Sequence, residues 1–187
     1  MNTLKITIAA AMALACLGGG AAQAREPAPG AQGARLIPVR VVERQRQHSV
    51  TGAAGGTRSR SVDYNHQPGS TSRQVNGSQT GPNGATHERS VDFNHQPGST
   101  SRQVNAGGTG PNGGSYSRST DVNHTAGVGT TRDATATRTG PNGATATRTV
   151  DYSHQPDGAT SRTVTVDGTR ANGSSFSETK SVDVQPH

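Results

Sequence analysis

Valine and aromatic residues alternate with polar residues along most of the chain after residue 58. Side chains of a β-strand point alternately to its two faces, so this alternation predicts strands rather than helices. In the most regular segment one predicted face carries His87, Arg89, Val91, Phe93 and His95. The other predicted face carries Thr86, Glu88, Ser90, Asp92 and Asn94. No apolar spacing of three to four residues predicts a helix beyond the amino-terminal segment.

The alternating segments recur as a repeat of about 29 residues. The first strand of each unit is predicted to open at Arg60, Arg89, Arg118 and Arg148, and a final half-unit opens at Lys180. The turn that closes the predicted hairpins is Gly-Pro-Asn-Gly at 81–84, 110–113 and 140–143, with variants at 155–158 and 170–173. Proline presets φ near −65° and glycine accepts a positive φ, so each is predicted to form a type I turn followed by a left-handed glycine.

These patterns predict an all-β protein with four and a half repeats over residues 58–187 and little core. Two architectures fit the repeat, namely an antiparallel hairpin meander and a β-solenoid with one unit per coil. Residues 25–57 read as a Pro/Gly/Arg-rich linker that contains one predicted strand over 36–42.

The amino-terminal residues have the organisation of a secretory signal. A basic start at Met1–Lys5 precedes the apolar run Ile6–Leu17, and Ala22-Gln23-Ala24 supplies a small-x-small cleavage site. We therefore expect a signal-peptide helix within residues 1–24, cleavage after Ala24, and export to the periplasm, the cell surface or the medium. A second reading takes Leu14-Ala15-Cys16 as part of a lipobox, in which case Cys16 would anchor the chain to lipid. The apolar run is too short to span a bilayer, and no transmembrane helix is expected in the mature chain.

Composition limits what the mature chain can do. Apolar residues make up 28% of the sequence and aromatic residues 3%, against 25 glycines. A large dry core is therefore excluded, and with it most enzymes that need a water-excluding pocket. The same thin apolar content leaves open a chain that is partly disordered in isolation. No Gly-x-Ser-x-Gly, His-Glu-x-x-His or Walker motif is present, so we expect neither an enzyme nor a bound cofactor.

Two sets of repeated residues are candidate binding groups. The first is the Asp-x-Asn-His motif, whose imidazoles are potential metal ligands at His66, His95, His124 and His154. Residues three apart on a strand point to opposite faces, so the aspartate and histidine of one motif should not chelate one ion. In a solenoid these histidines would stack about 4.8 Å apart, whereas in a meander they would lie about 9.6 Å apart. The alternative interpretation is that the aspartates cap turns and the histidines are polar strand ends.

The second set is a regular series of arginines. It comprises Arg60, Arg73, Arg89, Arg102, Arg118, Arg132, Arg148 and Arg162. Guanidinium groups bind carboxylates and phosphates with two parallel hydrogen bonds, so a regular array could contact an anionic polymer. Outside the cytoplasm such a polymer would be an anionic polysaccharide, lipopolysaccharide or extracellular DNA. The alternative is that each arginine pairs with an acidic residue of a neighbouring strand and protects the sheet from aggregation.

The recurring Thr-Gly-Pro-Asn-Gly element at 80–84, 109–113 and 139–143, with flanks rich in threonine and arginine, resembles poorly characterised repeat proteins exported by Gram-negative bacteria. The resemblance implies a cell-envelope or secreted setting and no defined activity. We therefore expect a non-catalytic structural or interaction protein of the envelope or extracellular matrix, with self-association as a further candidate property. A periplasmic metal-binding repeat is the alternative.

Overall fold

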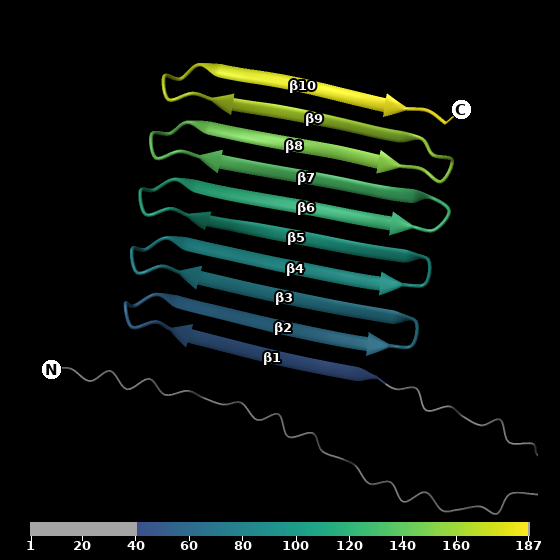
Figure 1. Ribbon diagram of the computed structural model, residues 1–187, viewed down its shortest axis with the longest axis horizontal. Coiled ribbons are helices and arrows are strands. Elements are labelled where there is room, and N and C mark those ends of the chain that lie inside the picture. Colours follow the sequence, from purple (N-terminus) through teal and green to yellow (C-terminus); the bar gives the residue numbers. More distant parts are fainter. Residues whose placement is uncertain (1–40, 187) are drawn as a thin grey trace, which may run out of the picture. The chain divides into compact units, whose positions relative to one another are not determined.

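The computed structural model describes residues 41–186, and these residues form one ten-stranded sheet (Figure 1). The strands are β1 (Val42–Thr51), β2 (Thr57–Gln67), β3 (Ser70–Thr80), β4 (Thr86–Gln96), β5 (Ser99–Thr109), β6 (Ser115–Thr125), β7 (Gly129–Thr139), β8 (Thr145–His154), β9 (Thr160–Thr169) and β10 (Ser175–Val184). Each strand pairs antiparallel with the next one in sequence, so the strand order in the sheet is the chain order. The prediction of an all-β repeat is confirmed, and the architecture is the meander rather than the solenoid.

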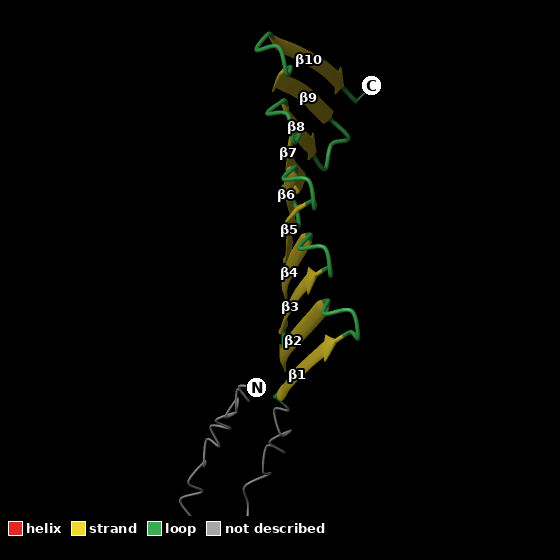
Figure 2. Cartoon of the chain, turned by 90° about the vertical axis from the view of Figure 1, so that its left-hand side faces the viewer, coloured by secondary structure: helices red, strands yellow, loops and turns green. Residues whose placement is uncertain are grey.

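The sheet is a single layer, as the edge-on view shows (Figure 2). Within residues 41–186 there is no buried hydrophobic side chain, and the sole buried polar residue is Thr120. Hydrogen bonds between strands and contacts between side chains of adjacent strands therefore take the place of a core. The described residues form no helix, and hence none that could cross a membrane.

A longer and a shorter kind of turn alternate from β1 to β6, one at each end of the strands. Beyond β6 the connection at 126–128 has three residues, and the one at 155–159 has the hydrogen bonds of the longer kind. The longer kind follows the predicted geometry in the turn at 81–85: Gly84 has φ of 80° and its N–H donates to the carbonyl of Gly81 at 3.0 Å. The N–H of Gly81 in turn donates to the carbonyl of Ala85 at 2.7 Å. In the shorter kind, Pro68 and Gly69 alone connect β2 to β3, and Gly69 also has a positive φ, of 80°. These short connections force consecutive strands to be neighbours, which is why the repeat closes as a meander.

The strands pair residue for residue, so equivalent positions of successive units line up in rows that run across the sheet. The central row contains Val62, Val75, Val91 and Val104, which face one another across β2 to β5. These four side chains are half-buried, because each is covered by its neighbours in the row and by no second layer.

The sheet begins earlier than the sequence predicts. Residues 42–51, within the segment assigned to a linker at 25–57, form β1 and pair with β2 along its whole length. The strand predicted over 36–42 lies almost entirely outside the described residues, as do the signal segment at 1–24, its cleavage site and Cys16.

Candidate polyanion-binding face

The register separates the acidic residues and the arginines of strands β1 to β9 onto opposite faces. Directly opposed residues of an antiparallel pair share a face, so each side chain can be assigned to a face from the pairing. One face, termed the basic face, carries every arginine of the ten strands: Arg44, Arg46, Arg58, Arg60, Arg73, Arg89, Arg102, Arg118, Arg132, Arg138, Arg148 and Arg162. The other, termed the acidic face, carries Glu43, Asp63, Glu88, Asp92, Asp121, Asp133, Asp151, Asp167 and Asp183. The remaining strand carboxylate, Glu178 of the edge strand β10, lies on the basic face with Lys180.

This separation contradicts the interpretation that the arginines pair with acidic residues of neighbouring strands. Among residues 41–186 the one ion pair is Lys180 with Glu178 on β10, where the Lys180 Nζ donates to Glu178 at 2.8 Å. Both side chains are exposed. The hydrogen bond from Lys180 and its positive charge lower the pKa of Glu178, and Glu178 raises the pKa of Lys180 by the same contacts. The arginines of the strands are exposed and have no acidic partner in the described part of the chain.

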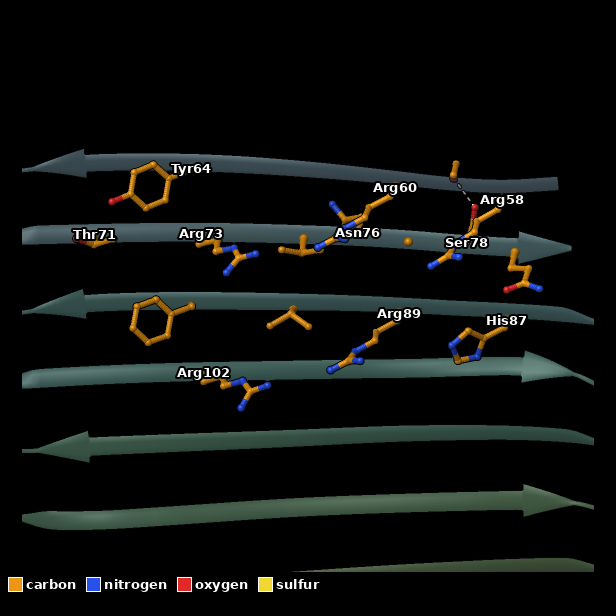
Figure 3. Close-up of a pocket in the computed structure, with 16 residues that line it drawn as sticks. Arg58, Arg60, Tyr64, Thr71, Arg73, Asn76, Ser78, His87, Arg89 and Arg102 are labelled. Atoms are coloured by element: carbon orange, nitrogen blue, oxygen red, sulfur yellow. Dashed lines mark hydrogen bonds between the residues drawn. The ribbon is translucent and has the colours of Figure 1, made fainter. Parts of the chain in front are cut away.

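Arginine alternates with aromatic or aliphatic residues in one row of the basic face, termed the aromatic–arginine row. From β1 to β10 it runs Arg44, Tyr64, Arg73, Phe93, Arg102, Val122, Arg132, Tyr152, Arg162 and Val182. Figure 3 shows Tyr64 of β2, Arg73 of β3 and Arg102 of β5 on one side of the close-up. Successive arginines are two strand spacings apart, about 9.6 Å.

A second arginine row lies four residues further along the strands, beyond the row of valines. It contains Arg60, Arg89, Arg118 and Arg148, and the residues opposite them on the intervening strands include Gly77, Ala106 and Ala136. The small side chains leave space beside each guanidinium. An open groove on the basic face accordingly extends between the two rows over β2 to β5, and its lining includes Arg60, Arg73, Arg89 and Arg102 (Figure 3).

The eight predicted arginines therefore all lie on one face, where the structure brings them together. Arg44, Arg46, Arg58 and Arg138 lie on the same face and are not among the predicted site residues. For Arg58 and Arg138 the signal was present in the sequence, because each is separated by an even number of residues from a predicted arginine of its own strand. For Arg44 and Arg46 the sequence offered no such spacing, because their strand was assigned to the linker.

The four candidate metal-ligating histidines form a third row of the basic face. In each case the imidazole Nδ1 is hydrogen-bonded to a threonine hydroxyl on the next strand, at 2.8 Å for His66 and His95 and 2.9 Å for His124 and His154. The strand that carries the threonine lies between two strands that carry histidines. Successive histidines are therefore two strand spacings apart, about 9.6 Å.

The aspartates of the Asp-x-Asn-His motifs, such as Asp63, lie on the opposite face from their histidines. Within the described residues no group of three histidine, cysteine or acidic side chains could hold a metal ion. The geometry therefore favours the role of polar strand end for these histidines, with a threonine as the partner.

One side-chain pair on the basic face spans three strands. His87 of β4 and Tyr116 of β6 are hydrogen-bonded above Gly108 of β5, with their ring centroids 6.0 Å apart and their planes at 22°. The pair can form because a side chain at position 108 would meet both the ring of Tyr116 and the carbonyl of Thr86. Sequence reasoning missed this contact, whose only signal is a glycine between two facing ring residues.

Comparison with protein-family models, curated proteins and solved structures finds no match to this chain. The resemblance of the repeat to exported bacterial proteins therefore stays a prediction.

Proposed function

We propose that the protein is an exported, non-catalytic component of the bacterial envelope or extracellular matrix that binds anionic polymers through its basic face. The observation that carries this proposal is the separation of charge: the strand arginines share one face, are exposed, and lack acidic partners in the described sheet. An arginine that is already paired with a carboxylate has few free hydrogen-bond donors for a ligand. An unpaired guanidinium on a flat surface remains available for charge-assisted hydrogen bonds to carboxylate, sulfate or phosphate.

The geometry of the face suits a polymer better than a small ligand. The arginines are distributed over strands β1 to β9 instead of converging on one cavity, and the groove among them is open to solvent. A long anion can contact many arginines at once, and each contact releases counterions from the polymer. Weak individual contacts, of the kind expected at an exposed surface, then add along the array.

The test is binding of the mature protein to duplex DNA and to heparin at a series of salt concentrations. For DNA, the slope of log affinity against log salt should become shallower by about 0.9 for each arginine contact that is removed. We expect this loss for Arg102→Gln, which removes a charge from the centre of the basic face. Arg170→Gln is the matched control, since Arg170 lies in the turn between β9 and β10 and stacks on the ring of Phe176 at 5.2 Å. Binding that is insensitive to salt, or equal losses in the two variants, would contradict the proposal.

A further inference from the structure

We infer that the aromatic–arginine row is a binding site for a linear acidic polysaccharide that carries one carboxylate per disaccharide and lies across the strands. This inference rests on the proposed function and narrows the class of polymer. It starts from the regular alternation of residue types along the row. An arginine lies on each odd-numbered strand up to β9, and an aromatic or aliphatic residue lies on each even-numbered strand.

The period of the arginines matches such a polymer. Arg44, Arg73, Arg102, Arg132 and Arg162 occupy every second strand, and the one-to-one register keeps them in line from β1 to β9. Their spacing is about 9.6 Å and the full row spans about 38 Å. One extended disaccharide has nearly the length of one such spacing. A polysaccharide with alternating uronate and neutral sugars would therefore present each carboxylate to a successive arginine.

The residues between the arginines suit the neutral sugars. Tyr64, Phe93 and Tyr152 are half-buried in the sheet, and they occupy three of the four positions between consecutive arginines. One face of a pyranose ring is lined with C–H groups and packs against an aromatic ring, whose face is electron-rich. The fourth position is held by Val122, which offers a smaller apolar contact.

The neighbouring row of the face supplies polar partners for sugar hydroxyls. On strands β2 to β9 the residue two positions beyond the member of the row is a histidine or a threonine, as with His66 after Tyr64 and Thr71 before Arg73. These imidazole and hydroxyl groups lie about 7 Å from the aromatic–arginine row. They face the same side as the polymer and can exchange hydrogen bonds with hydroxyl groups along its edge.

A nucleic acid fits the same row less well. Each strand of B-DNA carries a phosphate every 3.4 Å or so along the axis, so roughly three phosphates would fall within one arginine spacing. Single-stranded nucleic acids gain affinity by stacking successive bases on successive aromatic residues. Here an arginine separates each pair of rings, and the aromatic series is interrupted at Val122.

The experiment compares three polymers at equal charge concentration and 150 mM salt, using the mature protein. The probes are hyaluronan, with one carboxylate per disaccharide, polygalacturonate, with one per sugar, and duplex DNA. We expect the tightest binding per charge for hyaluronan. With hyaluronan oligosaccharides, affinity should rise roughly two- to fivefold for each added disaccharide, the gain expected of one exposed ion pair, until the arginines of the row are occupied.

Two variants separate the row from the rest of the basic face. Tyr64→Leu and Phe93→Leu keep apolar volume but remove the ring, and we expect them to abolish the preference for hyaluronan while leaving DNA binding unchanged. Tyr116→Leu is the control, because Tyr116 is an aromatic residue of the same face outside the row.

The outcomes distinguish this inference from the proposed function. Equal affinity per charge for the three polymers, or a preference for DNA, would overturn the inference and leave polyanion binding in place. The absence of binding to any polyanion would overturn both. A loss of hyaluronan preference in the Tyr116 variant equal to that in the Phe93 variant would also overturn the assignment to this row.

Discussion

The most direct test of the sheet register is the substitution Thr120→Val. Thr120 occupies the valine row on β6, between Val104 of β5 and Ala134 of β7. It is the most enclosed side chain of the described sheet, at 9% exposure, and its hydroxyl has no hydrogen-bond partner among the described residues. The other complete units have valine at the equivalent position, for example Val91.

The expected gain in stability follows from these observations. An enclosed hydroxyl without a partner costs about 1–3 kcal/mol in lost hydration, and valine replaces it with a methyl group of nearly the same shape. The added methyl contributes at most about 0.8 kcal/mol, because the row is covered only by its neighbours. We therefore expect Thr120→Val to raise the free energy of unfolding by about 1–2 kcal/mol. Each kcal/mol corresponds to a rise of roughly 2–4 °C in the melting temperature.

The assay is urea-induced unfolding followed by far-ultraviolet circular dichroism, with the slope of the transition checked for constancy. Thr137→Val is the matched control, since the Thr137 hydroxyl is bonded to that of Thr147 at 3.2 Å on the acidic face. Removing that bond should lower the stability by about 0.5–1.5 kcal/mol. Shifts of the same sign in the two variants would refute the reasoning, because the register alone assigns opposite environments to the two threonines.

Four further predictions concern a turn, a close contact across the sheet, the acidic face and export. Gly113→Ala should lower stability by about 1–2 kcal/mol, because Gly113 has φ of 80° although no atom would obstruct a methyl group there; thermal unfolding measures the loss. Gly108→Ala should cost about 1–3 kcal/mol for the different reason of overpacking, and it should shift the NMR signals of the tyrosine ring that lies above it. Asp92→Asn should leave the salt dependence of DNA binding unchanged, because Asp92 lies on the face away from the arginines; a shallower slope would contradict this. Expression in an exporting Gram-negative host should yield a mature chain that begins at Arg25 after cleavage behind Ala24, as measured by intact mass.

Much of the fold could be predicted from local pattern. The alternation at Val91 and Phe93 gives the phase of a strand, and Gly84 after Pro82-Asn83 gives the geometry of the turn. Both signals are short-range, and the structure confirms both. β1 could not be recognised in the same way, because arginine and glutamine dominate its sequence and it has no regular apolar alternation. It is a strand because β2 offers it an unpaired edge, and that interaction joins residues distant in sequence, such as Val42 and His66.

The separation of charge was only partly accessible from the sequence. Arg60 and Asp63 are three residues apart, an odd separation that places them on opposite faces of any strand. Whether Arg60 instead meets an acid of a neighbouring strand depends on the register, which is fixed by the length of the turns on both sides. The structure puts Gly77 of β3 and His48 of β1 opposite Arg60, and thereby leaves its guanidinium without an acidic neighbour.

The absence of a core in the described sheet has a consequence for how the repeats can change over generations. Apart from the pair formed by His87 and Tyr116, each strand of the described sheet contacts only the strands directly before and after it. Two strands can therefore be gained or lost by a duplication or deletion of one unit without disturbing distant contacts. Every additional unit would lengthen the aromatic–arginine row by one cation. The number of repeats would then set the avidity for the polymer. Variants of the gene could match polymers of different length by a change in repeat number alone.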